Sequence, residues 1–123
     1  GVQTCALPIL KQYEEYLILP KATPNSDPSW FGFPFNIREN NKFKRNNLAE
    51  FLEENKILTR QLFAGNMTKQ PAYKNVNYRI SGNLDNTDYI MHNTIFIGVY
   101  PGIDDIRINY ILSVFDKFFN NLH

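Results

Sequence analysis

The sequence has little cysteine and no long apolar run. Cys5 is the only cysteine among 123 residues, which excludes an internal disulfide and a metal site built on several cysteines. No stretch approaches the roughly 20 apolar residues that a membrane-spanning helix needs, and the start lacks the basic and apolar segments of a signal peptide. We therefore expect a cytoplasmic protein with no membrane partner and no redox chemistry carried by its own side chains alone.

An excess of charge of one sign is also missing. Thirteen basic and twelve acidic residues leave a net charge of +1, and the two signs are interspersed. A nucleic-acid-binding surface would need a basic patch, so we expect no nucleic-acid partner. The chain is rich in apolar side chains, with 43% hydrophobic and 15% aromatic residues, which is enough for a core. Its length and composition fit one globular domain at most.

The first nine residues, GVQTCALPI, do not fit the pattern that follows, because Pro8 interrupts the chain where a helical pattern begins. They resemble the peptide produced when sequencing-adaptor DNA is read as coding sequence. We therefore expect residues 1–9 to be a non-native scar and residues 10–123 to be the domain. Apolar positions recur at helical spacing from Leu10 to Leu17, which predicts the last turns of a helix whose earlier turns are missing.

Residues 20–28 carry three prolines. Proline fixes φ and lacks an N–H, so this segment is expected to be an extended crossing between elements. Residues 29–38, SWFGFPFNIR, alternate with a period of two, which predicts a strand with Phe31, Phe33 and Phe35 on one core-facing side. The proline inside this run predicts an edge strand or a bulge.

A helical pattern follows over residues 48–55, and Asn46 and Asn47 are its candidate N-caps. Three glutamates in this helix could be mistaken for a carboxylate site. Their spacing places them opposite the apolar side chains, which favours plain surface charge. A short β-like run over residues 57–62 comes next.

The second half of the chain predicts a brief extended piece at 78–80, a helix that starts near 86–88, and a strand over 94–100. That strand stops at the turn pair Pro101–Gly102, and Asp104 and Asp105 open the last helix. The last helix has the clearest periodicity in the chain, a stripe for packing on a sheet. The stripe consists of Ile108, Ile111, Leu112, Phe115, Phe118, Phe119 and Leu122.

Together these elements predict an α+β fold, with a small mixed or antiparallel sheet and helices on one face. No complete active site is visible: there is no Ser-His-Asp set, no nucleophilic cysteine, no glycine-rich phosphate loop and no metal-ligand spacing. The residues alone indicate an α+β domain that contacts a ligand.

Leu58–Tyr73, LTRQLFAGNMTKQPAY, is the best candidate binding segment. A short apolar run breaks there into a loop dense in donors and acceptors, and binding residues concentrate on loops held by a rigid scaffold. The fork of Arg60 could hold a phosphate or a carboxylate. Two alternatives stay open, because the same residue types make ordinary surface connections, and Arg60 could form a salt bridge with a neighbouring acid.

Five segments carry a resemblance to a known family. In order, LPKATPNSDPSWFGFPF, ENKILTR, LFAGNMTKQPAY, GNLDNTDYIM and FIGVYPG resemble the C-terminal part of the pyridoxamine-phosphate-dependent CDP-4-keto-6-deoxyglucose 3-dehydrases of lipopolysaccharide and dideoxysugar synthesis. These enzymes are a branch of the DegT-type sugar aminotransferases, which have the aspartate aminotransferase fold (fold type I). The resemblance implies that residues 10–123 are the small C-terminal domain of such an enzyme, truncated at its N-terminal side.

The resemblance implies a lyase that removes the C3 hydroxyl of a CDP-linked 4-keto-6-deoxyhexose, with pyridoxamine or pyridoxal phosphate as the electron sink. It also implies a [2Fe-2S] cluster, a partner reductase and a homodimer. The catalytic histidine, the cofactor phosphate site and the cluster cysteines would lie upstream of this chain. We therefore assign no catalytic or metal-binding residue here: His92 does not sit in the matching motif, Cys5 belongs to the expected scar, and the chain alone should be inactive.

In this family the small domain closes over the sugar nucleotide. The resemblance therefore carries a substrate-contact role onto the SWFG segment and onto polar residues of the candidate loop. The residues concerned are Ser29, Trp30, Phe31, Gly32, Arg60, Gly65, Asn66, Thr68 and Gln70.

Two other functions stay open. The same domain occurs in nucleotide-sugar aminotransferases that use pyridoxal phosphate, and a non-enzymatic binding module could retain the small-domain fold. The upstream sequence distinguishes the enzymes, because an active-site histidine with clustered cysteines favours the dehydrase and a Schiff-base lysine favours the aminotransferase.

Overall fold

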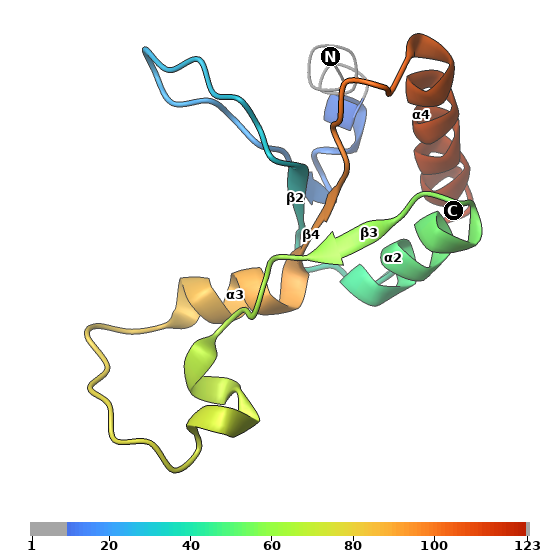
Figure 1. Ribbon diagram of the computed structural model, residues 1–123. Helices are drawn as coiled ribbons and strands as arrows, with labels where there is room; N and C mark the ends of the chain where they lie inside the picture. Colours follow the sequence, from blue (N-terminus) through green and yellow to red (C-terminus); the bar gives the residue numbers. More distant parts are fainter. Residues whose placement is uncertain (1–9, 123) are drawn as a thin grey trace.

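A small antiparallel sheet lies at the centre of the computed structural model, which describes residues 10–122. The predicted scar at residues 1–9 lies outside the described residues. The sheet has the order β1-β2-β4-β3, and every neighbouring pair is antiparallel (Figure 1). Its strands are β1 (Leu17–Ile18), β2 (Phe33–Ile37), β3 (Thr59–Gln61) and β4 (Thr94–Ile97).

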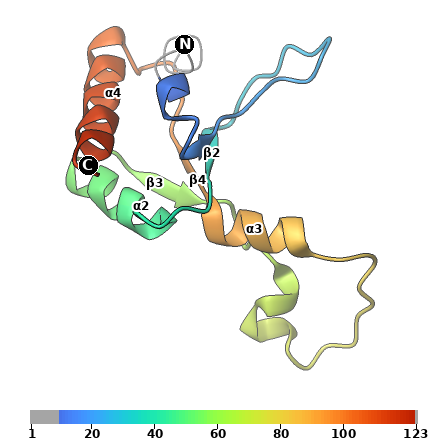
Figure 2. The same cartoon turned by 180° about the vertical axis from the view of Figure 1, so that it is seen from behind.

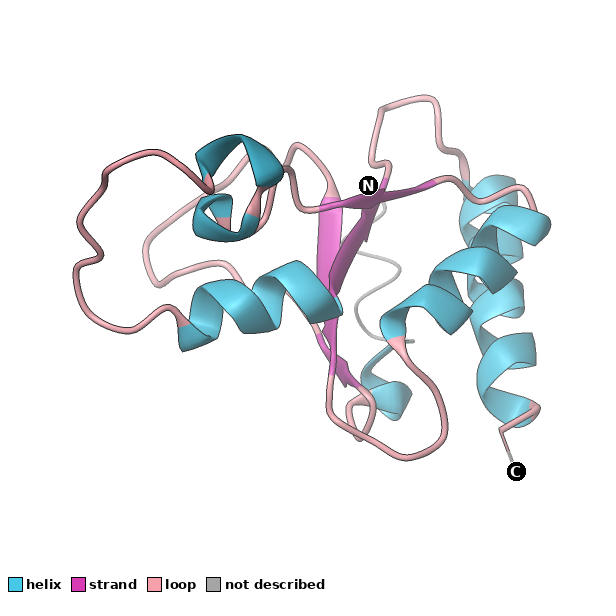
Figure 3. Ribbon diagram, turned by 90° about the horizontal axis from the view of Figure 1, so that it is seen from below, coloured by secondary structure: helices cyan, strands magenta, loops and turns pink. Residues whose placement is uncertain are grey.

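Helices lie on both sides of this sheet. They are α2 (Arg45–Glu54), α3 (Asp85–Asn93) and α4 (Asp105–Asn120), with short 3-10 turns η1 (Lys11–Tyr13), η2 (Met67–Lys69) and η3 (Pro71–Tyr73). Figures 1 and 3 show α2 and α4 on one side, and α3 with η2 and η3 on the other. The α+β class is confirmed, and the one-face arrangement holds for α2 and α4. Within residues 10–122, no helix combines the length and apolar character needed to cross a membrane.

The core fills the space between the sheet and the pair α2 and α4. Phe33 and Phe35 of β2 lie opposite Ile97 and Ile95 of β4, and all four side chains are buried. Because cross-strand partners point to the same face, these residues form one apolar surface. The ring of Phe115 from α4 packs edge-on against Phe35, with 5.6 Å between ring centroids.

The last helix follows its predicted pattern. Asp104 is the N-cap and its carboxylate accepts the backbone N–H of Arg107 at 2.9 Å. Most of the predicted stripe is buried, while Ile111 and Leu122 are half-buried against the core. The buried members of the stripe are Ile108, Leu112, Phe115, Phe118 and Phe119.

The predicted helix end over residues 10–17 is wrong. The chain makes only the turn η1 there and then enters β1, because Leu17 pairs with Ile37 and the carbonyl of Tyr16 accepts the Arg38 N–H at 2.8 Å. Tyr13 stacks on Phe119 with 4.2 Å between ring centroids. Burial, together with a hydrogen bond to Asp116, raises the pKa of Tyr13 to about 12. The apolar spacing thus reflects packing of a turn and a strand.

The predicted strand over 29–38 is shorter in the structure, and its proline lies at a position where β2 is an edge only locally. Phe31 precedes β2 and is 81% exposed, so its expected core position is wrong. β2 lies between β1 and β4, but β1 pairs only with Asn36 and Ile37. At Pro34 the strand therefore has β4 as its only paired neighbour, which explains how an inner strand tolerates a residue without an N–H.

Other boundaries also differ from the predicted ones. α2 begins at Arg45, so Asn46 and Asn47 lie inside it, and Asn47 accepts the backbone N–H of Lys44 at 2.8 Å. The glutamates of α2 are exposed, as predicted. The later elements differ by a few residues. β3 and β4 are shorter than predicted, α3 begins at 85, and residues 78–80 form no strand.

Candidate functional site

The face of the sheet that points away from α2 and α4, called here the outer face, collects the predicted site residues. Arg60 lies opposite Phe96, which lies opposite Pro34, so the three side chains share this face. Arg60 is exposed and forms no ion pair with any residue in the range 10–122. Within the described chain, the salt-bridge alternative for Arg60 therefore finds no support.

Two long loops border the outer face. Residues 19–32 and residues 62–84 both extend from the side of the sheet that carries α3, away from α2 and α4 (Figures 1 and 2). The hydroxyl of Tyr89 in α3 donates to the Ile37 carbonyl at 2.9 Å. This bond holds α3 at the end of β2, so the half of the outer face near Arg60 stays open between the loops.

Three phenylalanine rings meet on that open half. Phe31, Phe63 and Phe96, called here the aromatic cluster, have centroid distances of 5.8 Å, 6.4 Å and 6.5 Å. Together with Trp30 they line a shallow, mostly apolar hollow. A Cβ on Gly32 would come within 2.5 Å of the Phe96 ring. Gly32 is therefore needed for the close approach of the SWFG segment to β4. Ser29 lies at the exposed end of this segment.

The polar residues of the loop bind mainly to the protein itself. Asn66 is 2% exposed, and its side-chain carbonyl accepts the backbone N–H of Thr68 at 3.0 Å and the Thr68 hydroxyl at 2.7 Å. Its amide donates to Asp88 of α3 at 2.6 Å. Asn66 therefore starts η2 and ties it to α3. A substrate contact by Asn66 or Thr68 stays a prediction.

Gly65 and Gln70 serve the same loop geometry. Gly65 has φ +63°, and a Cβ there would lie 2.5 Å from a side-chain carbon of Met91. Only glycine meets both conditions without strain. The amide of Gln70 donates to the Ala64 carbonyl at 2.5 Å. Loop residues 64–70 are thus preorganised against α3, next to the aromatic cluster.

Asp88 anchors this loop electrostatically. Asp88 lies in the first turn of α3, where the helix dipole favours a negative charge, and its carboxylate faces the loop. Lys69 Nζ lies 2.8 Å from its carboxylate. The hydrogen bond from Lys69, followed by that from Asn66, lowers the pKa of Asp88 below its usual value.

We expect acidification to loosen this loop. Because the pKa of Asp88 is lower in the folded state than in the unfolded one, its contribution is present above the ordinary carboxyl pKa and is lost as pH falls through the lowered value. Hydrogen exchange of residues 62–73, corrected for intrinsic rates, should become faster at acidic pH. Asp88→Asn should remove that pH dependence. Equal acid sensitivity in the variant would contradict the assignment.

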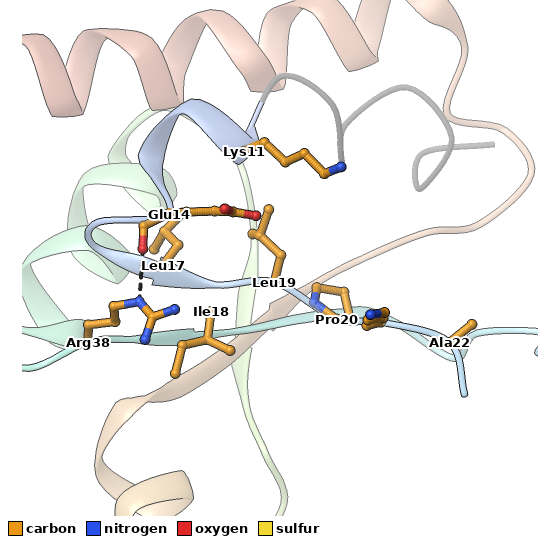
Figure 4. A pocket seen from close by; sticks show the side chains of 9 residues that line it. Lys11, Glu14, Leu17, Ile18, Leu19, Pro20, Ala22 and Arg38 are labelled. Atoms are coloured by element: carbon orange, nitrogen blue, oxygen red, sulfur yellow. Dashed lines mark hydrogen bonds between the residues drawn. The ribbon is translucent and has the colours of Figure 1, made fainter. Parts of the chain in front are cut away.

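A separate hollow lies beside β1 and is lined by Lys11, Glu14, Leu17–Ala22 and Arg38 (Figure 4). The guanidinium of Arg38 donates to the Glu14 carbonyl at 2.8 Å, which ties the turn before β1 to the end of β2. The sequence predicts no site residue here. The hydrogen bond from Arg38 to Glu14 in this hollow therefore has a structural role.

The starts of α3 and α4 do not form a cradle for a cofactor phosphate, because Asp85 and Asp88, and Asp104 and Asp105, lie at these starts. α2 is on the side of the sheet away from the outer face (Figure 3). No group of His, Cys, Asp and Glu side chains that could hold a metal ion is found among residues 10–122. The described residues therefore fit substrate contact but do not fit pyridoxal phosphate or an iron–sulfur cluster, and we assign no step to either group.

Sequence reasoning did not single out Phe63 or Phe96, and it did not predict that Asp88 anchors the loop. Phe96 alternates with the buried residues Ile95 and Ile97, so a strict period of two would have placed it on the outer face. Phe63 and Asp88 have no such signal. The position of each depends on how the loop folds back onto α3.

Known proteins resemble nearly the whole chain. A model of the DegT/DnrJ/EryC1/StrS aminotransferase family matches residues 7–116. The lipopolysaccharide biosynthesis protein RfbH of Salmonella typhimurium is 48% identical over 119 residues, which are 97% of this chain and 25% of that protein. The dTDP-4-dehydro-2,6-dideoxy-D-glucose 3-dehydratase of Saccharopolyspora spinosa is 48% identical over 102 residues, 83% of this chain and 22% of that protein. The chain thus spans about a quarter of these curated relatives' length.

A solved structure agrees with these relatives. The Escherichia coli GDP-4-keto-6-deoxy-D-mannose-3-dehydratase with bound hydrated PLP matches with a TM-score of 0.73 and 29% identity, over 92% of this chain and 29% of that chain. The expected relationship to sugar 3-dehydratases is confirmed, and so is the expected fold.

Proposed function

Because the chain belongs to the DegT/DnrJ/EryC1/StrS aminotransferase family, we propose that it is the substrate-covering C-terminal part of a sugar-nucleotide 3-dehydratase. The whole enzyme would remove the C3 hydroxyl of a nucleotide-linked 4-keto-6-deoxyhexose. The chain's similarity to sugar 3-dehydratases supports this reaction class. One observation of the chain itself carries the proposal: Arg60 is an exposed cation on the open outer face, next to the aromatic cluster.

In this proposal the outer face closes over the substrate. Arg60 supplies a planar cation suited to the diphosphate of a sugar nucleotide, because its fork can donate two parallel hydrogen bonds. Trp30 and Phe31 cover the adjoining part of the ligand and exclude water. Gly32 and the loop residues Gly65, Asn66, Thr68 and Gln70 hold these parts in place, with Ser29 at the exposed margin.

Finer points of the proposal rest on the resemblance in the sequence. They are CDP as the nucleotide, pyridoxamine or pyridoxal phosphate as the cofactor, a [2Fe-2S] cluster, a partner reductase, a homodimer and a cytoplasmic location. Among the described residues none fits the cofactor or the cluster, so the proposal places both in the region outside this chain.

Arg60→Ala in the full-length enzyme should lower kcat/KM for the sugar nucleotide by about 10- to 100-fold, which corresponds to the loss of one hydrogen bond to a charged group. Cofactor absorbance should not change, since Arg60 contacts the substrate only. Arg79→Ala is the matched control, because Arg79 is an exposed arginine in the loop of residues 62–84. Unchanged kinetics for Arg60→Ala would remove Arg60 from the site.

The family also contains aminotransferases, so the same assay should identify the product. Mass spectrometry of the sugar nucleotide after incubation distinguishes loss of water at C3 from gain of an amine at C4. An aminated product would assign the chain to the second reaction and leave the role of Arg60 intact.

A further inference from the structure

Phe63 has an unusual backbone conformation within the turn that the Gly65 N–H closes on the Leu62 carbonyl at 3.3 Å. Its φ is +50°, in the left-handed region that a bulky side chain rarely adopts. Strain of this kind persists where the surrounding structure holds it, and it concentrates at ligand clamps. The strained backbone does not bury the ring, because the side chain of Phe63 is 75% exposed. The protein therefore presents this ring outward.

The neighbouring rings leave room for a flat ligand. Phe31 and Phe63 are tilted by 36°, and their angles with Phe96 are 58° and 52°. Rings held at such angles do not stack on one another completely, so the faces of Phe31 and Phe63 remain free to stack on another ring. The hollow that they line is almost wholly apolar.

One cation lies beside this apolar hollow. Arg60 is directly opposite Phe96 across the sheet, and its guanidinium has no acidic partner in the described part of the chain. An aromatic surface with an adjacent free cation complements a planar ring that carries an anionic group. A nucleoside diphosphate has both parts.

We propose that the aromatic cluster is the base-stacking subsite for the nucleotide part of the substrate, with Phe63 as its main stacking residue and Arg60 on the diphosphate. The inference rests on the proposed function and deepens it. Stacking tolerates different bases, because every base has a π-face. This fits relatives that act on dTDP-linked and GDP-linked sugars. The cluster supplies affinity, and the choice of base is made elsewhere.

The test is calorimetric titration of the full-length protein with cytidine, guanosine, CDP, GDP and pyrophosphate. Phe63→Gly removes the ring and relieves the left-handed strain, so the variant should fold. It should bind both nucleosides and both nucleoside diphosphates about tenfold more weakly, while pyrophosphate binding is unchanged. Phe63→Tyr should restore binding. Arg60→Ala should give the reverse pattern, with pyrophosphate affected and nucleosides unaffected. Tyr78→Ala, which removes an exposed aromatic ring of the long loop, is the control.

The outcomes separate the two proposals. Wild-type nucleoside affinity in Phe63→Gly would overturn the stacking subsite, and a retained effect of Arg60→Ala on pyrophosphate would leave the proposed function standing. If Phe63→Gly instead splits an oligomer in sedimentation without changing ligand affinity, the cluster is a contact between protein subunits and the inference is wrong. If Phe63→Gly leaves nucleoside affinity unchanged and Arg60→Ala leaves pyrophosphate affinity unchanged, both proposals are wrong.

Discussion

Phe115→Ala is expected to lower the free energy of unfolding by about 3–5 kcal/mol, the largest stability loss that we predict. Phe115 is fully buried and its ring contacts Phe35 of β2 and Phe119 of α4, with centroid distances of 5.6 Å and 6.4 Å. Truncation removes the apolar contact and leaves a cavity between helix and sheet. Packed aromatic neighbours on both sides limit how far the site can collapse.

Urea denaturation followed by circular dichroism would measure this loss. Ile106→Ala is the matched control in the same helix, because Ile106 is 80% exposed and its truncation should change stability by no more than about 0.5 kcal/mol. Equal midpoints for the two variants would show that α4 does not pack on the sheet as described.

Asn66→Ala is expected to destabilise the loop locally by about 2 kcal/mol, through loss of a cap and exposure of unsatisfied partners. The variant leaves the Thr68 N–H without its acceptor and Asp88 without one of its two donors. Since η2 contributes no buried residue to the core, the effect should stay within the loop and α3 rather than unfold the sheet.

Hydrogen exchange would locate this effect. Protection of residues 62–73 should fall in Asn66→Ala, whereas the β-sheet amides keep wild-type rates. Asn86→Ala is the control, since Asn86 is an exposed asparagine in α3. Uniform loss of protection over the whole chain would mean that the loop is part of the global folding unit.

The sequence predicted the elements whose periodicity is carried by large apolar side chains. The stripe of α4 and the alternation at Phe33 and Phe35 are such cases, because burial enforces those spacings directly. The turn at Pro101–Gly102 and the Asp104 cap were predicted for local reasons that need no tertiary context.

The failures share one cause. Between Leu10 and Leu17 the same spacing fits a helix or a turn followed by a strand, and only pairing with Ile37 decides between them. Phe31 fitted the alternation of β2, but the strand begins after it. Partners distant in sequence determine both outcomes, so a local pattern could not.

The candidate site, too, was predicted only where local residue types were enough. Residue types nominated Arg60 and the loop, and the structure places them beside the same face. Thr68 donates to Asn66, and Asn66 donates in turn to Asp88 of α3, a partner twenty-two residues further along the chain that a local pattern does not reveal. The aromatic cluster combines rings from residues 31, 63 and 96, and no motif search joins positions so far apart.

The strand order has a consequence for synthesis on the ribosome. β4 pairs with both β2 and β3, yet it is the last strand in the chain. Until residues 94–97 have emerged from the exit tunnel, β2 and β3 have no shared neighbour and the apolar side of β2 remains open to solvent. Pairing over such sequence distances also carries a loop-closure cost that slows folding. The nascent polypeptide should therefore depend on chaperones until β4 has been synthesised, and pausing shortly before β4 would prolong the period in which it can aggregate.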